Sequence, residues 1–118
     1  MSILDLTAET FDSFVQESDL AIVEFWAKWC GPCIVFSELL EKLSTKDPQI
    51  RFAKVDIEAC PTLSTDFKIK AVPTIMIFRR EFVVYAESGV LTQAALLELI
   101  EQAKKIDLEQ LREQLAKN

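Results

Sequence analysis

Hydrophobic residues recur along the chain at two different spacings, which separate predicted helices from predicted strands. A spacing of three and four residues, typical of an amphipathic helix, occurs in residues 8–17, after residue 33 and after Thr92. Short runs rich in apolar residues instead predict strands, and the first run is apolar on both faces apart from Glu24, as suits the centre of a sheet. These runs are residues 21–26, 51–56, 74–78 and 82–85.

Residues that favour helix ends bound the helical segments. Thr7 and Thr92 are suited to N-cap positions, and Pro61 suits the first turn of a further short helix. The pair Asp47-Pro48 is predicted to end the long helix that follows residue 33. The buried stripe of that long helix is expected to consist of Val35, Phe36, Leu39, Leu40 and Leu43.

The C-terminal segment carries one more amphipathic pattern, behind a capping-box pair at Asp107 and Gln110. Its apolar residues are Leu108, Leu111 and Leu115. We predict a helix over 108–116, and we divide the chain into a domain of residues 1–106 and a helical extension of the same domain, residues 107–118. The leucines need an apolar partner, which is either the domain itself or another protein chain.

The order of these elements predicts the fold class. Helices alternate with strands, and the gap between residues 78 and 82 is short enough for an antiparallel hairpin. The chain is therefore expected to form one α/β domain. The turn of the hairpin, Arg79-Arg80-Glu81, has no Gly or Asn, so its geometry is left open.

Composition narrows the function classes. The net charge of −6 argues against nucleic acid and anionic membranes as partners, because both require clustered Lys and Arg. No run approaches the roughly 18 apolar residues of a membrane span, and no basic segment with an apolar run behind it opens the sequence. The three cysteines are an odd number, unlike a secreted disulfide framework. We therefore expect a cytoplasmic protein that keeps its thiols reduced.

Two cysteines, Cys30 and Cys33, flank Gly31 and Pro32 at the start of the predicted long helix. A helix N-terminus favours the thiolate of Cys30, the nucleophilic form, and Cys33 lies one turn further along, better shielded, as suits a resolving thiol. Pro32 stiffens the turn and Gly31 lets a substrate chain approach. The pattern predicts dithiol–disulfide exchange through a redox-active Cys30–Cys33 disulfide.

Other roles for the cysteines are weaker. A closed zinc site usually needs four Cys or His ligands, and the chain has three Cys and no His. A purely structural disulfide between Cys30 and Cys33 would close too small a loop to stabilise much. The third cysteine, Cys60, is interpreted as an inert residue at a helix start, with a regulatory thiol that forms an intermolecular disulfide as the alternative.

The residues around the motif resemble the active-site signature of the thioredoxin family, over about residues 3–104. The matching segments are Phe25-Trp26-Ala27-Lys28-Trp29-Cys30-Gly31-Pro32-Cys33, Val55-Asp56 and Ala71-Val72-Pro73-Thr74. The resemblance implies the thioredoxin fold, a central mixed β-sheet with helices on both faces, and reduction of protein disulfides. It also implies that no cofactor is bound, that NADPH supplies electrons through thioredoxin reductase, and that the partners are disulfide-containing proteins.

Further site residues are implied by the resemblance alone. Pro73 is expected to be a cis-proline that faces the two cysteines, beside the backbone of Val72 where an extended substrate strand would dock. Trp29 would flank the site as an apolar platform. Gly89 would line the substrate groove.

Glu24 falls where the family usually has a buried Asp that helps to deprotonate the second cysteine, and Lys54 falls where a lysine commonly pairs with that acid. The alternatives are a strand-edge carboxyl and a solvated lysine. Glu24 is one methylene longer than Asp, which is expected to bring the carboxyl closer to the cysteines. Ile34 replaces a common basic residue, and Glu38 replaces a helix-kinking proline, so a straighter helix is expected.

Three functions compete on this basis. The first is a general disulfide reductase, and the second is a specialised thioredoxin-like protein with few clients. The third is an interaction module that holds a partner in the groove between Trp29 and Pro73, with cysteine chemistry secondary. We expect a monomer, with a dimer formed through the C-terminal helix or Cys60 as the alternative.

Overall fold

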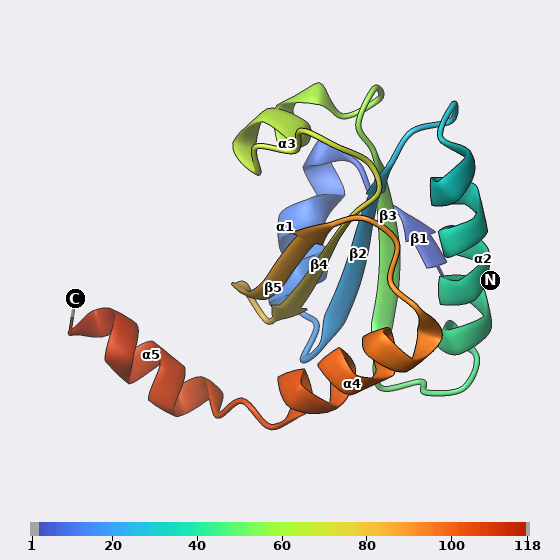
Figure 1. The fold of residues 1–118 in the computed structure, drawn as a ribbon. Coiled ribbons are helices and arrows are strands. Elements are labelled where there is room, and N and C mark those ends of the chain that lie inside the picture. The colour runs from blue at the N-terminus through green and yellow to red at the C-terminus, as the bar shows by residue number, and fades with distance from the viewer. Residues whose placement is uncertain (1–2, 118) are drawn as a thin grey trace.

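A mixed five-stranded sheet forms the centre of the computed structural model, which describes residues 3–117 (Figure 1). The strands are β1 (Ile3–Asp5), β2 (Ala21–Trp26), β3 (Arg51–Asp56), β4 (Thr74–Arg79) and β5 (Phe82–Ser88), in the spatial order β1-β3-β2-β4-β5. β3 pairs parallel to both β1 and β2, whereas β4 pairs antiparallel to β2 and β5. The predicted mixed sheet is thus confirmed. Met1, Ser2 and Asn118, which belong to the predicted ranges 1–106 and 107–118, lie outside the described residues.

Helices cover both faces of the sheet. They are α1 (Ala8–Gln16), α2 (Gly31–Ser44), α3 (Pro61–Asp66) and α4 (Gln93–Lys104), and a further helix, α5 (Leu108–Ala116), follows α4 in the chain. On one face, α2 and α4 share a hydrophobic core with Ile22 and Ile75; on the other, α1 and α3 share a core with Val23 and Phe25. Side chains alternate along a strand, so Glu24 lies on the α2 and α4 side. No helix within residues 3–117 is long and apolar enough to cross a membrane.

The predicted buried stripe of α2 is wrong at one position. Phe36, Leu40 and Leu43 are buried as expected, but Val35 is 66% exposed. Each helical residue turns by about 100°, which carries Val35 away from the line of Phe36 and Leu40 toward solvent. The helix also ends at Ser44, earlier than the predicted stop at Asp47-Pro48.

The edge strand β1 was not predicted, and β5 extends further than predicted. β1 has only three residues, of which Ile3 alone is buried, so no alternation can develop. It forms by pairing with β3, a tertiary contact. β5 continues past Tyr85 to Ser88 through exposed and polar residues, which its pairing with β4 holds in the sheet.

The hairpin between β4 and β5 turns through Arg80 and Glu81, with Arg80 in the left-handed region at φ 53°. Long-range contacts hold this backbone. The Arg80 amide donates to the Ser18 carbonyl at 3.0 Å, and its guanidinium pairs with Asp19 at 2.7 Å. Tertiary structure therefore supports a turn conformation that Gly or Asn would adopt more readily.

The C-terminal segment forms α5, as predicted, and Asp107 accepts the Gln110 amide at its start. None of its residues is buried, and it points away from the sheet (Figure 1). Arg112 links it to the domain, because its guanidinium lies 3.5 Å from the Glu81 carboxylate and 5.6 Å from the centre of the Phe82 ring. The junction before α5 is held more firmly, because Arg79 donates to the carbonyl groups of Ala103 and Ile106.

Candidate active site

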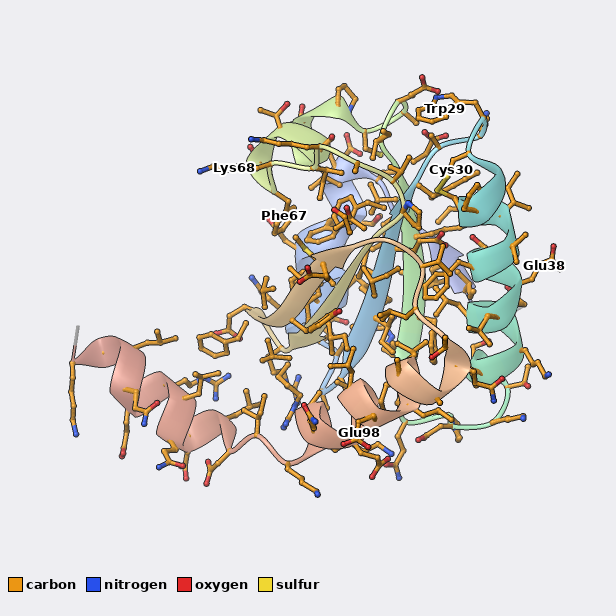
Figure 2. All side chains as sticks on the ribbon, in the orientation of Figure 1. Trp29, Cys30, Glu38, Phe67, Lys68 and Glu98 are labelled. Carbon is orange, nitrogen blue, oxygen red and sulfur yellow. A yellow bond between two sulfur atoms is a disulfide. The ribbon has the colours of Figure 1, made fainter. Side chains whose placement is uncertain are left out.

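The two motif cysteines lie at the N-terminus of α2, directly after the central strand β2 and its short loop (Figure 2). Cys30 is the N-cap residue, and its Sγ accepts the backbone N–H of Cys33 at 3.2 Å. Pro32 lies in the first turn, where a backbone N–H has no acceptor within the helix, so the lack of an N–H in proline costs no helical hydrogen bond. The local sequence therefore places the Cys30 sulfur at the positive end of a 14-residue helix.

A disulfide joins Cys30 and Cys33. Cys33 is fully buried, whereas Cys30 retains 5% exposure at the rim. A thiol-disulfide exchange partner can therefore approach the Cys30 sulfur before that of Cys33. The structure brings the pair together in the arrangement that the motif predicts.

A second loop, which leads into the neighbouring strand β4, faces the disulfide. The peptide bond between Val72 and Pro73 is cis, as predicted, and the Val72 carbonyl oxygen lies 3.8 Å from Cys30 Sγ. Gly89 joins this loop, because its amide donates to the Pro73 carbonyl at 2.8 Å. Its φ of +109° is one that residues with a side chain rarely adopt. Gly89, distant in sequence, thus meets the Val72-Pro73 pair, and Val72 lies beside Cys30.

Trp29 precedes the disulfide and is 67% exposed, at the outer end of the loop in Figure 2. Its Nε1 donates to the Glu58 carboxylate at 3.1 Å, which orients the indole. Ile34, Val35 and Val90 are also about half exposed or more. The neighbourhood of the disulfide therefore presents apolar side chains to solvent.

Glu24 is fully buried in β2, directly opposite Lys54 in the parallel pairing with β3. Its Oε1 accepts the hydroxyl of Ser37 at 2.5 Å, while its Oε2 is buried without a hydrogen-bond partner within the described residues. Burial raises the pKa of Glu24 from 4.5 to about 7, against the opposing effects of the Ser37 hydrogen bond and the Lys54 charge. The carboxyl is thus able to accept or release a proton near neutral pH.

Lys54 acts on Glu24 at longer range than an ion pair. Its ammonium lies 3.9 Å from the Asp5 carboxylate and 4.6 Å from the centre of the Trp26 ring. Its positive charge nevertheless lowers the pKa of Glu24. Sequence reasoning placed Lys54 near the acid but missed Asp5, because the edge strand that carries Asp5 was not predicted.

Ser37 is a site residue that sequence reasoning missed. Besides Glu24, its hydroxyl contacts the Cys33 carbonyl oxygen at 2.9 Å. The available signal was its position four residues after Cys33, which places both on one side of α2.

Cys60 lies apart from this site at the start of α3. It is a buried free thiol whose Sγ lies 3.5 Å from the Leu6 carbonyl oxygen. Burial and the negative charges of Asp56 and Glu9 raise the pKa of its thiol, which disfavours the reactive thiolate. No cluster of three or more Cys, Asp or Glu that could hold a metal ion occurs in residues 3–117.

The sequence model of the thioredoxin family matches residues 2–102. The chain belongs to the thioredoxin family. Thioredoxins are thiol-disulfide oxidoreductases that need no bound cofactor, so this chain is a dithiol–disulfide oxidoreductase with Cys30 and Cys33 as its redox pair.

Individual thioredoxins resemble the chain over most of its length. It is 42% identical to putative thioredoxin 2 of Streptomyces coelicolor, over 98% of this chain and 86% of that protein. Identity to thioredoxin C-3 of Corynebacterium nephridii is 32%, over 84% of this chain and 69% of that protein.

Solved thioredoxin structures share the fold. A mutant thioredoxin from Halobacterium salinarum NRC-1 superposes with a TM-score of 0.82 at 26% identity, over 90% of this chain and 94% of the other. Thioredoxin f2 of Chlamydomonas reinhardtii superposes with a TM-score of 0.80 at 30% identity, over 89% of this chain and 99% of the other. The predicted thioredoxin fold is therefore confirmed.

Proposed function

We propose that this thioredoxin is a general protein-disulfide reductase in which Cys30 is the nucleophile and Cys33 the resolving thiol. The observation that carries the assignment is the unequal shielding of the two sulfurs at one helix N-terminus. Cys30 lies at the rim and its sulfur accepts a backbone N–H, whereas Cys33 is fully buried. A hydrogen bond and the helix dipole stabilise a thiolate at Cys30.

Two exchange steps complete one turnover. The Cys30 thiolate attacks one sulfur of a client disulfide, a Cys30–client bond forms, and the other client sulfur leaves as a thiolate. Cys33 loses its proton and attacks Cys30, which releases the second client sulfur and leaves the Cys30–Cys33 disulfide. The client gains two electrons and the cysteine pair loses two.

A client would bind between the loop before α2 and the loop at the cis peptide. An extended client strand would align with the backbone of Val72 and Pro73, opposite Cys30 Sγ, which lies 3.8 Å from the Val72 carbonyl. Gly89 leaves that edge open because it has no side chain. Gly31 and Pro32, both exposed, and Trp29 would form the other wall.

Glu24 would accept the proton of Cys33. The acid is buried on the same face of the sheet as α2, and its pKa of about 7 allows it to be ionised in a large fraction of molecules at neutral pH. Lys54 would keep that fraction from falling further, because its charge favours the carboxylate. Glu24 and Lys54 would thus tune the second exchange step.

NADPH, through a thioredoxin reductase, would return the disulfide to the dithiol, and the cytoplasm would be the working compartment. We expect the purified protein, NADPH and a thioredoxin reductase to reduce insulin catalytically, with NADPH oxidation as the readout. The protein reduced beforehand with dithiothreitol serves as the control, because it bypasses the reductase. Insulin reduction only in that control would refute the electron source, and no reduction in either assay would refute the general reductase.

A specialised client set is the second candidate. Ile34 and Val35 leave the edge of the site apolar at 46% and 66% exposure, which favours clients with apolar residues around the disulfide. Replacing both Cys30 and Cys33 with serine distinguishes an interaction module from a disulfide reductase. Biological function retained in that double variant would favour the module.

The α5 extension would contribute little to the stability of the domain. Removing residues 107–118 is expected to lower the free energy of unfolding by less than about 1 kcal/mol, since the Arg112–Glu81 pair is half exposed and no side chain of α5 is buried. The cut leaves Ile106 and its hydrogen bond with Arg79 in place.

Urea unfolding and analytical ultracentrifugation of both chains would check this prediction. We expect a monomer with and without the extension, since Cys60 is buried and α5 is only loosely attached. A loss above about 2 kcal/mol would instead show that α5 is integral to the domain. Dissociation of a dimer after truncation would assign α5 to an interface.

A further inference from the structure

A single hydroxyl group links the buried acid to the main chain of the buried cysteine. Ser37 Oγ lies 2.5 Å from Glu24 Oε1 and 2.9 Å from the Cys33 carbonyl oxygen. Ser37 comes from the second turn of α2, whereas Glu24 comes from the central strand β2. The contact therefore joins the two elements that carry the reaction.

The hydroxyl of Ser37 has one proton and two acceptors within reach. When Glu24 is ionised, Ser37 can donate to the carboxylate. When Glu24 is protonated, the acid can donate to Ser37 Oγ, and the serine proton is then free to bond the Cys33 carbonyl. The protonation state of Glu24 thereby decides whether Ser37 donates its proton to Glu24 or to the carbonyl of Cys33, the residue whose thiol must be deprotonated.

We propose that Ser37 is a positioning residue of the reaction: its hydroxyl holds the Glu24 carboxyl in place and couples it to the backbone of Cys33, so that the resolving thiol has a fixed proton acceptor. This inference rests on the proposed role of Glu24. It adds a residue whose substitution changes the rate of the second exchange step while both cysteines and the acid stay in place.

The surroundings of Glu24 leave Ser37 as its one direct polar partner among the described residues. Lys54 faces it from β3 but pairs with Asp5, and β4 presents the apolar Ile75 opposite. On α2, the thiol of Cys33 is titratable in the reduced protein, whereas Glu38 and Lys42 of the same helix are exposed and Glu41 is half-buried. The remaining neighbours on this face, from α2 and α4, are apolar core residues.

The proton and electron changes of the step balance within these groups. The Cys33 S–H bond breaks and its proton passes to the Glu24 carboxylate. The Cys33 sulfur forms a bond to Cys30 Sγ, the bond from Cys30 to the client sulfur breaks, and that sulfur leaves as a thiolate. Glu24 later returns its proton to solvent or to the departing thiolate. Ser37 contributes no atom to the products.

The test compares Ser37→Ala with Ser37→Thr in the full-length protein. Loss of the hydroxyl removes a hydrogen bond that favours the carboxylate, so Ser37→Ala is expected to lower the acid dissociation constant of Glu24 about tenfold. Ser37→Thr keeps a hydroxyl and is expected to titrate like the wild type. Carboxyl-carbon NMR of the oxidised protein measures this directly. Ser44→Ala is the matched control, because Ser44 also bonds a carbonyl within α2 but not Glu24.

Kinetics test whether the same coupling serves the reaction. With dithiobis(nitrobenzoate), attack by Cys30 releases the first nitrothiobenzoate and attack by Cys33 releases the second. The second release should slow about fivefold at pH 7 in Ser37→Ala, because the ionised fraction of Glu24 falls from about one half to about one tenth. The two proteins should converge above pH 9, where Glu24 is ionised in both.

Each outcome bears on one part of the proposal. An unchanged Glu24 titration in Ser37→Ala, or a Ser37→Thr that behaves like alanine, overturns the role of Ser37 and leaves Glu24 as acceptor intact. A shifted titration without slower release at pH 7 overturns the role of Glu24 as well. Equal slowing at pH 7 and pH 9 would mean that Ser37 only maintains the helix, which also overturns the proposal.

Discussion

Replacing Cys33 with serine is expected to convert the protein from a turnover enzyme into a covalent trap for its clients. Cys30 keeps its position as N-cap of α2 and still attacks a client disulfide. A serine hydroxyl at position 33 cannot displace the client sulfur, because it is barely ionised near neutral pH and is a poor nucleophile toward disulfides. We expect insulin turnover to fall by more than about a thousandfold.

The trapped adduct is measured by non-reducing electrophoresis and by intact mass, which should show one client chain per protein, released by dithiothreitol. Cys30→Ser is the informative counterpart, because it should neither turn over nor form adducts while Cys33 stays fully buried. Cys60→Ser should leave both behaviours unchanged, since its thiol is buried and disfavours the thiolate. Adducts of Cys30→Ser equal to those of Cys33→Ser would reverse the assigned roles.

The parts of the fold that were predictable are those determined by local patterns. β2 is buried on both faces and has an apolar run interrupted by Glu24, and α2 has both a motif at its start and a regular stripe behind it. The elements that were missed depend on partners far away in sequence. β1 needs β3 beside it, and the left-handed Arg80 needs Ser18 and Asp19.

The same division holds within the active site. The cysteine pair and the cis-proline lie in contiguous motifs that sequence similarity identifies. The contact of Ser37 with Glu24 depends on how closely α2 packs on β2 and on the length of the glutamate side chain, and neither is visible in a sequence pattern. A serine in an amphipathic helix is usually explained by solvent exposure, so its chemical role emerged only from the distances.

Replacing Glu24 with glutamine is expected to stabilise the oxidised protein at neutral pH while slowing the second exchange step. The pKa of Glu24 is about 7 in the folded protein and about 4.5 when exposed, so the folded state binds the proton more tightly than the unfolded state. Below pH 4.5 Glu24 is protonated in both states, so its ionisation does not lower the free energy of unfolding. As the pH rises from 4.5 to 7, the unfolded state gains from ionisation that the folded state cannot match, and stability falls.

Glutamine is neutral in both states and removes this loss. Each pKa unit is worth 1.36 kcal/mol, so Glu24→Gln should gain about 3 kcal/mol over the wild type at pH 8 and almost nothing at pH 4. Urea unfolding of the oxidised proteins at pH 4, 6 and 8 measures this difference. Glu38→Gln, which removes an exposed carboxyl of α2, controls for net charge and should change stability by less than about 0.5 kcal/mol at each pH.

A gain that grows with pH would show that this thioredoxin carries an acid whose burial destabilises it at the pH where it works. Burial of the carboxyl accounts for that cost, because Oε2 has no hydrogen-bond partner among the described residues and the Ser37 hydroxyl on Oε1 offsets only part of it. A fully hydrogen-bonded carboxylate would stay ionised and could not take up a proton. Equal differences at all three pH values would mean that the pKa of Glu24 is the same in the folded and unfolded states. In that case the carboxylate would be too weak a base to serve as the acceptor for the proton of Cys33.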